Sequence, residues 1–160
     1  MTQEYLWRHL SATGTSQSTL TWSGWTKVCH DTNTRQVLFS FENAGGHASL
    51  HYENYKLKWN TASNGYLDTS EFFTDYQAWN HVVFQMDTTQ QNVQDRFYLW
   101  VNGVRCRMDE GNSSHGQNAE LDGVFEYDHS MYLGQQHNAS VGFFDGYMTC
   151  LLYTSDAADE

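Results

Sequence analysis

Proline is absent from this sequence of 160 residues, and cysteine occurs only three times. Cys29, Cys106 and Cys150 form no Cys-x-x-Cys pair, so neither a zinc ribbon nor a thioredoxin-type redox site is indicated. We expect Cys29 and Cys106 to be free thiols, because nothing in the sequence specifies a disulfide between them. No run approaches about eighteen apolar residues, which excludes a membrane-spanning helix, and no signal peptide is visible at the N-terminus.

Positive charge is also scarce. The chain has eight lysines and arginines against nineteen aspartates and glutamates, for a net charge of −11. The basic residues do not cluster in any segment, and binding to nucleic acid requires concentrated positive charge. We therefore expect no nucleic-acid partner, and we interpret the acidity as a solvated surface.

Aromatic residues are abundant, at 16% of the chain, and they occur in segments where apolar and polar residues alternate. This period of two is typical of half-buried strands. The clearest unit is residues 97–106, where Asn102-Gly103 has the composition of a type I′ hairpin turn. The alternation predicts that Val82, Phe84, Leu99 and Val101 are buried together. Helix signals are weak and confined to the segment around Tyr5 to Leu10.

Eight or nine such strands, with no helices to connect parallel neighbours, predict an all-β fold. We expect an antiparallel sandwich of two sheets. The longest segment without a pattern is a predicted loop over residues 109–128, and long ordered loops often carry function.

Four short motifs follow one another along the chain. They are Trp-x-His-Val-Val at residues 79–83, Leu-x-Val-Asn-Gly at 99–103, Tyr-Leu-Gly at 132–134 and Phe-Asp-Gly-Tyr at 144–147. Together they resemble the laminin-G-like, concanavalin A-like lectin/glucanase family. The closest variety is the one found in phage and marine-virus structural proteins such as tail fibres. The resemblance covers roughly residues 5–148 and implies a jelly-roll sandwich. It says little about the ligand, because function on such a fold depends on the site.

The last eleven residues, CLLYTSDAADE, differ from the strand with which family members continue. Their back-translation resembles the inner end of a transposase-type sequencing adapter. We therefore interpret residues 1–149 as a single domain truncated at its C-terminus, from a metagenomic fragment, and residues 150–160 as a tail that is not native. The alternative is a genuine acidic tail. In either case we expect the tail to continue the closing strand, beside an N-terminal strand, as far as about Thr154.

The segment ELDGVFE at residues 120–126 is the strongest enzymatic motif. Family glucanases carry a Glu-x-Asp-x-x-Glu strand, whereas Glu120, Asp122 and Glu126 here have one residue more. Six residues of strand separate the two glutamates by about 20 Å, while retaining hydrolysis needs carboxyl groups about 5 Å apart. We therefore expect no catalytic residues and no enzymatic activity.

No cofactor is expected, although some relatives bind Ca²⁺ near one rim of the sandwich. If a calcium site exists, the sequence offers Asp122, Asp128 and Asp145 as ligands, without EF-hand spacing. The alternative for Asp145 is a turn residue whose carboxylate bonds nearby backbone N–H groups.

Trp25, Tyr98 and Trp100 lie on the strand phase opposite to the predicted core. Exposed aromatic rings can stack on sugar rings, which makes these three residues a predicted ligand-binding set. The alternative is that they pack under a loop or a neighbouring subunit.

The function indicated is a non-catalytic carbohydrate-binding or adhesion module of a viral structural protein. Its expected partners are a host-surface glycan and other virion subunits, and its expected location is the virion or the extracellular space. A structural decoration or oligomerisation domain without ligand is the rival hypothesis, and a degenerate glucanase is the third.

Overall fold

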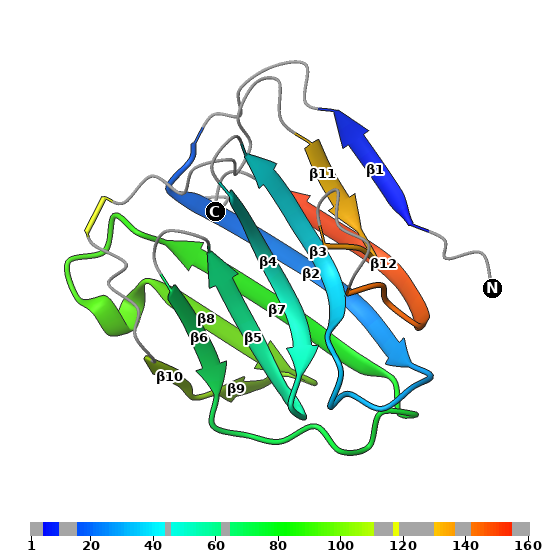
Figure 1. Ribbon diagram of the computed structural model, residues 1–160. Helices are drawn as coiled ribbons and strands as arrows, with labels where there is room; N and C mark the ends of the chain where they lie inside the picture. The colour runs from blue at the N-terminus through cyan, green and yellow to red at the C-terminus, as the bar shows by residue number, and fades with distance from the viewer. Residues whose placement is uncertain are drawn as a thin grey trace.

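Two antiparallel sheets lie face to face in the computed structural model (Figure 1). The structure describes residues 5–9, 16–43, 46–61, 65–110, 117–118, 130–136 and 142–154. The all-β, antiparallel sandwich of two sheets expected from the alternating pattern is confirmed, as is the jelly roll that the family resemblance implies.

One sheet has seven strands in the order β1-β11-β3-β4-β5-β6-β10. Their bounds are β1 Leu6–His9, β3 Gln36–Asn43, β4 Gly46–Glu53, β5 Lys56–Thr61, β6 Gly65–Thr69, β10 Met108–Glu110 and β11 Ser130–Leu133. The other sheet has five strands in the order β12-β2-β7-β8-β9. Their bounds are β2 Thr19–Val28, β7 Asn80–Asp87, β8 Phe97–Val101, β9 Val104–Cys106 and β12 Gly146–Thr154. A short 3-10 helix, η1, spans Val93–Asp95.

The weak helix signal near Tyr5 was misleading, because Leu6–His9 is the edge strand β1. This segment pairs with β11 over its whole length, so tertiary pairing overrides its local preference. The short strands β6 and β10 were also not expected. Three to five residues are too few for a clear alternating pattern.

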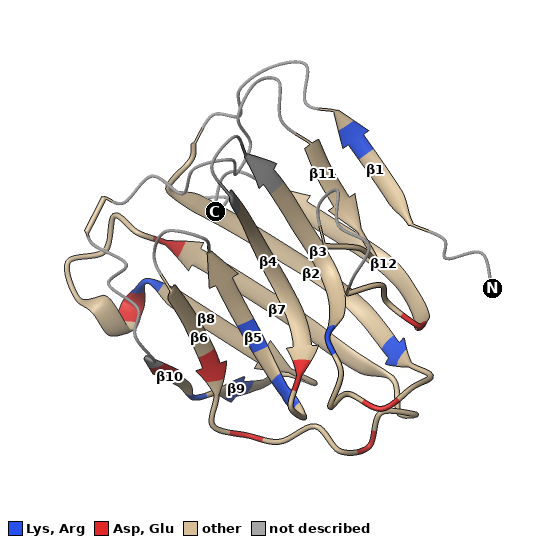
Figure 2. Cartoon of the chain, in the orientation of Figure 1, with Lys and Arg blue, Asp and Glu red and all other residues tan. Residues whose placement is uncertain are grey.

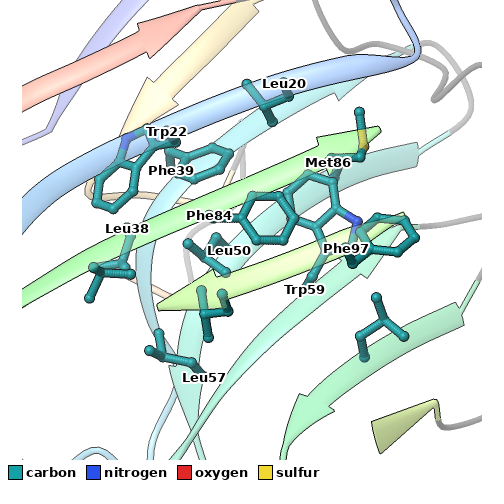
Figure 3. Close-up of a cluster of buried hydrophobic side chains, with 14 of the residues drawn as sticks. Leu20, Trp22, Leu38, Phe39, Leu50, Leu57, Trp59, Phe84, Met86 and Phe97 are labelled. Carbon is teal, nitrogen blue, oxygen red and sulfur yellow. The ribbon is translucent and has the colours of Figure 1, made fainter. Parts of the chain in front are cut away.

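The core lies between the sheets and consists mainly of aromatic and aliphatic side chains from alternate strand positions (Figure 3). Phe84 is at its centre, with ring centroids 4.7 Å from Trp59 and 6.4 Å from Phe39 and from Phe97. Phe39 and Trp59 belong to the seven-stranded sheet and Phe84 to the five-stranded one, so the contacts of Phe84 with Phe39 and Trp59 join the two layers. Such ring pairs contribute about 0.5–1.5 kcal/mol each beyond the burial of their area.

The predicted joint burial of Val82, Phe84, Leu99 and Val101 is confirmed, with exposed fractions of 8% or less. Their registers pair Val82 with Val101 and Phe84 with Leu99 across β7 and β8. Successive side chains of a strand point to opposite faces, so the alternate residues of β7 and β8 must lie on the outer face of the five-stranded sheet. These outer residues are the candidates for a functional role.

Tight turns set these registers. Asn102 and Gly103 have φ values of 53° and 78°, which confirms the left-handed two-residue turn expected between β8 and β9. The side chain of Asn102 also ties this turn to β7, since its Oδ1 accepts the backbone N–H of His81 at 2.9 Å.

β12 pairs with β2 and completes the five-stranded sheet, as expected for a closing strand beside an N-terminal strand. Its register shifts between Thr149 and Leu152, and the strand then continues to Thr154. Leu151 and Tyr153 pack against the core, while Leu152 is 59% exposed. The non-native origin of residues 150–160 stays a prediction.

All three cysteines are free, with Cys106 buried and Cys29 and Cys150 exposed. Burial and the charge of Glu71 raise the pKa of the Cys106 thiol to about 11, which makes this side chain an inert part of the core. Within the described ranges, no helix is long and apolar enough to cross a membrane.

Candidate functional site

The outer face of the five-stranded sheet brings together the three aromatic residues predicted to bind a ligand. Trp25 of β2 lies opposite His81 of β7 in the ladder. In the next row of the same face, Trp100 of β8 is flanked by Val83 and Arg105. Tyr98 follows in the row after that, opposite Gln85.

Trp25 is the most exposed of the three, at 41%. Its indole lies 5.1 Å from the His81 ring, measured between centroids. The Nε2 of His81 is in turn 3.1 Å from the hydroxyl of Ser23, which lies on the same face. The histidine is thus held from two sides, and it supports the indole without covering it.

Tyr98 and Trp100 are half-buried and stack on each other, with centroids 5.5 Å apart and planes 22° from parallel. The Tyr98 hydroxyl donates a hydrogen bond to Oδ1 of Asp95 at 2.9 Å. This carboxylate, together with partial burial, raises the pKa of the Tyr98 hydroxyl. The Arg105 guanidinium lies 4.3 Å from the centroid of the same ring. The rings of Trp100 and Tyr98 and the guanidinium of Arg105 therefore form one ordered stack.

The spacing of the rings suits an extended ligand. Trp25 and Trp100 are two strands apart and two residues offset, which places their Cα atoms about 12 Å from each other at ordinary sheet spacings. A single pyranose ring is shorter than this distance. Stacking on both indoles at once therefore requires an oligosaccharide.

A second aromatic pair extends the face toward β12. Tyr147 is 62% exposed and Trp79 is 44% exposed, with their ring centroids 6.5 Å apart. Tyr147 is paired with Lys27 of β2. The face thus carries aromatic groups from near its β12 edge to its β8–β9 side.

Of the three metal ligands that the sequence offers, the structure describes only Asp145. Asp145 is exposed, and its hydrogen bonds are made by its backbone rather than by its carboxylate. Its N–H donates to Gln36 Oε1 at 2.7 Å, and its carbonyl accepts the N–H of Cys29 at 2.7 Å. Asp122 and Asp128 lie outside the described residues. Within the described ranges, no three His, Cys, Asp or Glu side chains converge in a way that could hold a metal ion.

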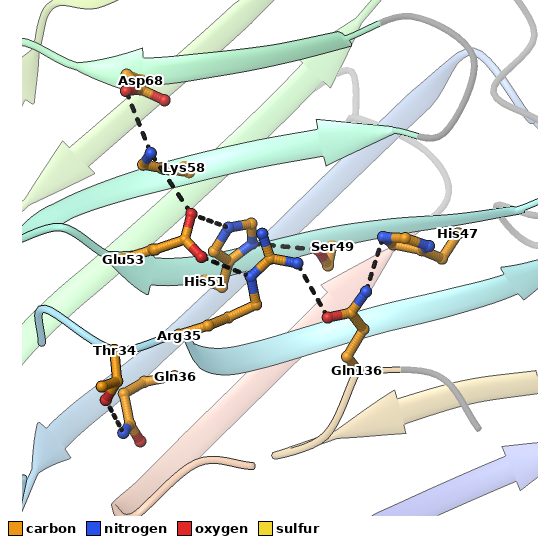
Figure 4. A network of polar contacts seen from close by, with 10 residues as sticks. All are labelled: Thr34, Arg35, Gln36, His47, Ser49, His51, Glu53, Lys58, Asp68 and Gln136. Atoms are coloured by element: carbon orange, nitrogen blue, oxygen red, sulfur yellow. Dashed lines mark hydrogen bonds and ion pairs between the residues drawn. The ribbon is translucent and has the colours of Figure 1, made fainter. Parts of the chain in front are cut away.

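The glucanase-like residues Glu120, Asp122 and Glu126 also lie outside the described part of the chain. A different polar network crosses the outer face of the seven-stranded sheet (Figure 4). Arg35 donates to Glu53 at 3.0 Å and to Gln136 at 3.0 Å. Lys58 bridges the carboxylates of Glu53 and Asp68, at 3.5 Å from each.

Within this network, Ser49, His51 and Glu53 stand at alternate positions of β4. The Ser49 hydroxyl is 3.1 Å from Nδ1 of His51, and Nε2 of His51 is 4.0 Å from Glu53. The order of groups is that of a serine-type triad. However, both Ser49 and His51 are completely buried, so the hydroxyl cannot reach a substrate.

The ionisation states in this network oppose acid catalysis. Burial lowers the pKa of His51 to about 3, with the charges of Arg35 and Lys58 acting in the same direction and that of Glu53 opposing them. Burial alone would raise the pKa of Glu53, but the hydrogen bond and charge of Arg35, with His51 and Lys58, outweigh it and lower that pKa. A glycosidase general acid needs a raised pKa. The network is therefore a structural one.

Arg105 and Tyr147 also belong to the aromatic face but were not predicted from the sequence, although a signal for Arg105 was present. A two-residue turn at Asn102-Gly103 places residue 105 opposite residue 100, so counting across the hairpin finds it. Tyr147 could be assigned only after β12 was paired with β2 in a known register.

A family model described as the concanavalin A-like lectin/glucanases superfamily matches residues 6–157. A search among curated proteins finds no match. Among solved structures, the heptameric SAP-like pentraxin of Limulus polyphemus is similar with a TM-score of 0.63 and 17% identity, over 93% of this chain and 68% of that one.

Domains LG4-5 of the mouse laminin alpha1 chain match with a TM-score of 0.64 and 9% identity, over 96% of this chain. This chain spans only 40% of the length of that laminin fragment. The CBM40 of the Ruminococcus gnavus IT-sialidase, bound to α2,3-sialyllactose, matches with a TM-score of 0.59 and 18% identity, over 94% of this chain and 92% of that one. At these identities the similarity concerns the fold alone.

Proposed function

Because the chain belongs to the concanavalin A-like lectin/glucanases superfamily and presents an ordered aromatic face, we propose that it is a non-catalytic carbohydrate-binding or adhesion module. The observation that carries the proposal is the arrangement of Trp25, Tyr98 and Trp100 on the outer face of the five-stranded sheet. Aromatic faces bind the apolar faces of sugar rings, while nearby polar groups orient the hydroxyls. His81, Gln85 and Arg105 are the polar groups at hand.

The order of the rings supports a binding role over an accidental patch. Trp100 is stacked on Tyr98, and Tyr98 is anchored by Asp95. Ligand stacking therefore does not require these side chains to lose much further rotational freedom, and preorganisation of this kind favours affinity.

The non-catalytic part of the proposal rests on the polar network of the seven-stranded sheet. Glu53 and Asp68 share the ammonium of Lys58, and the pKa of Glu53 is lowered rather than raised. The neighbour with bound sialyllactose supports glycan recognition on this fold. The virion context is a further part of the proposal, and it rests on the resemblance of the motif order to phage and marine-virus structural proteins.

The proposal is tested with the Trp25→Ala and Trp100→Ala variants on a glycan array, followed by titration with the best glycan. Loss of a stacking ring should weaken binding by about 1–3 kcal/mol, by analogy with base stacking on aromatic side chains. Trp7→Ala is the matched control, because Trp7 is 60% exposed but lies in β1 of the other sheet.

Circular dichroism and urea unfolding check that each variant remains folded. If the wild-type protein retains no glycan, or if Trp7→Ala weakens binding as much as Trp25→Ala, the aromatic face is not a sugar site. The rival hypothesis, a structural decoration or oligomerisation domain without ligand, would then gain support if sedimentation showed an oligomer that the Trp25→Ala variant cannot form.

A further inference from the structure

The charge distribution on the aromatic face differs from that of the whole chain. The protein carries nineteen acidic and eight basic residues. Yet in Figure 2 the strands of the five-stranded sheet are mainly neutral, with basic colour on β2 and β9 and acidic colour at an end of β7. A face with few acidic groups on an acidic protein suits a negatively charged ligand, because carboxylates on the face would repel it.

The rows that carry the two indoles contain no carboxylate among the described strand residues. One row runs from Thr149 through Trp25 to His81, and the next runs from Leu152 through Ser23, Val83 and Trp100 to Arg105. Lys27 adds a second cation two residues beyond Trp25 on the same face of β2.

Two carboxylates, Asp87 and Asp95, lie at the end of the face where Tyr98 stands, and both are engaged. Asp87 accepts the backbone N–H of Thr89 at 3.0 Å and the side chain of Gln90 at 2.6 Å. Asp95 accepts the Tyr98 hydroxyl. The rows of Trp25 and Trp100 themselves contain the cation Arg105 and no carboxylate, so their own charge balance is positive.

Arg105 is arranged to receive an anion. Its guanidinium carbon lies 4.3 Å from the centroid of the Tyr98 ring, which helps to hold the group in place, while the Arg105 residue as a whole is exposed. A planar guanidinium held in this way can bind a carboxylate through two parallel hydrogen bonds. At ordinary sheet spacings its Cα lies about 16 Å from that of Trp25, a distance that only an oligosaccharide can bridge.

We propose that the aromatic face selects acidic oligosaccharides, with Arg105 binding the carboxylate of a sugar acid while Trp25 and Trp100 stack on rings of the same chain. This inference rests on the proposed function, because it requires that the face bind glycans at all. It adds a ligand class and assigns Arg105 as the residue that determines specificity.

The experiment compares oligogalacturonate with its methyl-esterified form by isothermal titration calorimetry, since the two differ in charge but share the sugar backbone. A neutral galacto-oligosaccharide of equal length is the third ligand. We expect oligogalacturonate to bind at least about tenfold more tightly than the ester, because charge-assisted hydrogen bonds are the stronger ones. Raising the salt concentration should reduce this difference.

Arg105→Gln should remove most of the preference, because the affinity for oligogalacturonate should fall to about that for the ester. Arg107→Gln is the matched control: it removes the same charge two residues away, from a side chain that is 82% exposed and pairs with Asp109. We expect this variant to retain the preference.

The outcomes separate the two proposals. Equal binding of charged and esterified chains overturns the acidic specificity and leaves the carbohydrate-binding role intact. A preference that survives in Arg105→Gln, or is lost equally in Arg107→Gln, overturns the assignment to Arg105. Failure to bind any glycan, here and on the array, overturns the proposed function itself.

Discussion

Phe84 shows how much of the stability depends on single residues in the core. It is fully buried and touches aromatic rings from both sheets, with Trp59 the nearest at 4.7 Å. Its neighbour Val83 points to the opposite side of the same strand. The two adjacent positions therefore differ in environment but not in backbone conformation.

Phe84→Ala should lower the free energy of unfolding by about 3–5 kcal/mol, because the substitution leaves a cavity that a packed core refills only in part. Val83→Ala is the control and should cost less than about 1 kcal/mol. Urea unfolding followed by tryptophan fluorescence measures both. Similar losses for the two variants would mean that the core does not lie where the structure places it.

At the residue scale the outer face is built by the same alternation that builds the core. Trp22 is completely buried, whereas Trp25 is 41% exposed, although only two residues separate them in β2. The chemical type of a side chain therefore says little about its role here. Its strand phase decides whether it stabilises the fold or remains available to a ligand.

At the scale of elements, the pairing of β12 with β2 closes the five-stranded sheet. Gly146 begins β12 opposite Val28 of β2. A Cβ atom at this position would meet the backbone carbonyl oxygen of Lys27 and would lie 2.9 Å from both the Val28 Cα and the Phe144 ring. Since backbone atoms cannot move aside as a flexible side chain can, the strand requires glycine at this point.

Gly146→Ala should therefore shift or detach the start of β12 and destabilise the protein by at least about 2 kcal/mol, in the range of overpacking substitutions. Thr149→Ala, an exposed position on the same strand, should change stability by no more than about 0.5 kcal/mol. The measurements are the urea midpoint and hydrogen exchange of the β2 amides. A Gly146→Ala protein as stable as the Thr149→Ala protein would contradict this pairing.

At the scale of the whole molecule, the polar network on the seven-stranded sheet couples stability to pH. His51 is completely buried, and its pKa is lowered from 6.5 to about 3 by burial and by Arg35 and Lys58. Between these two pH values the unfolded chain binds the proton and the folded chain does not. Stability is therefore complete above about pH 6.5 and is lost as the pH falls toward 3.

Between pH 6.5 and pH 4.5 this one group should remove about 2–3 kcal/mol of stability, at 1.36 kcal/mol for each pH unit. The lowered pKa of Glu53 adds a further loss below its ordinary 4.5. The check is the urea midpoint at four pH values for the wild type and for His51→Gln. The variant should show a flatter dependence between pH 6.5 and 4.5, and an unchanged slope would mean that other groups cause the acid sensitivity.

Much of the fold could be predicted from the sequence, because the alternation in residues 19–28, 82–86 and 97–101 is long enough to define buried and exposed phases. The same alternation put Trp25, Tyr98 and Trp100 on outward positions, and the Asn102-Gly103 turn fixed the register of β8 with β9. These features are local, and backbone geometry alone determines them.

The tertiary structure decided which outward positions share a face. Trp25 and Trp100 are 75 positions apart in the sequence, and they become neighbours on one sheet only because β7 lies between β2 and β8. The stack of Arg105 on Tyr98, the need for glycine at residue 146 and the burial of His51 likewise depend on contacts between distant strands. A period of two specifies the side of a strand to which a residue points, but long-range strand pairing specifies what it meets there, and no local pattern encodes that pairing.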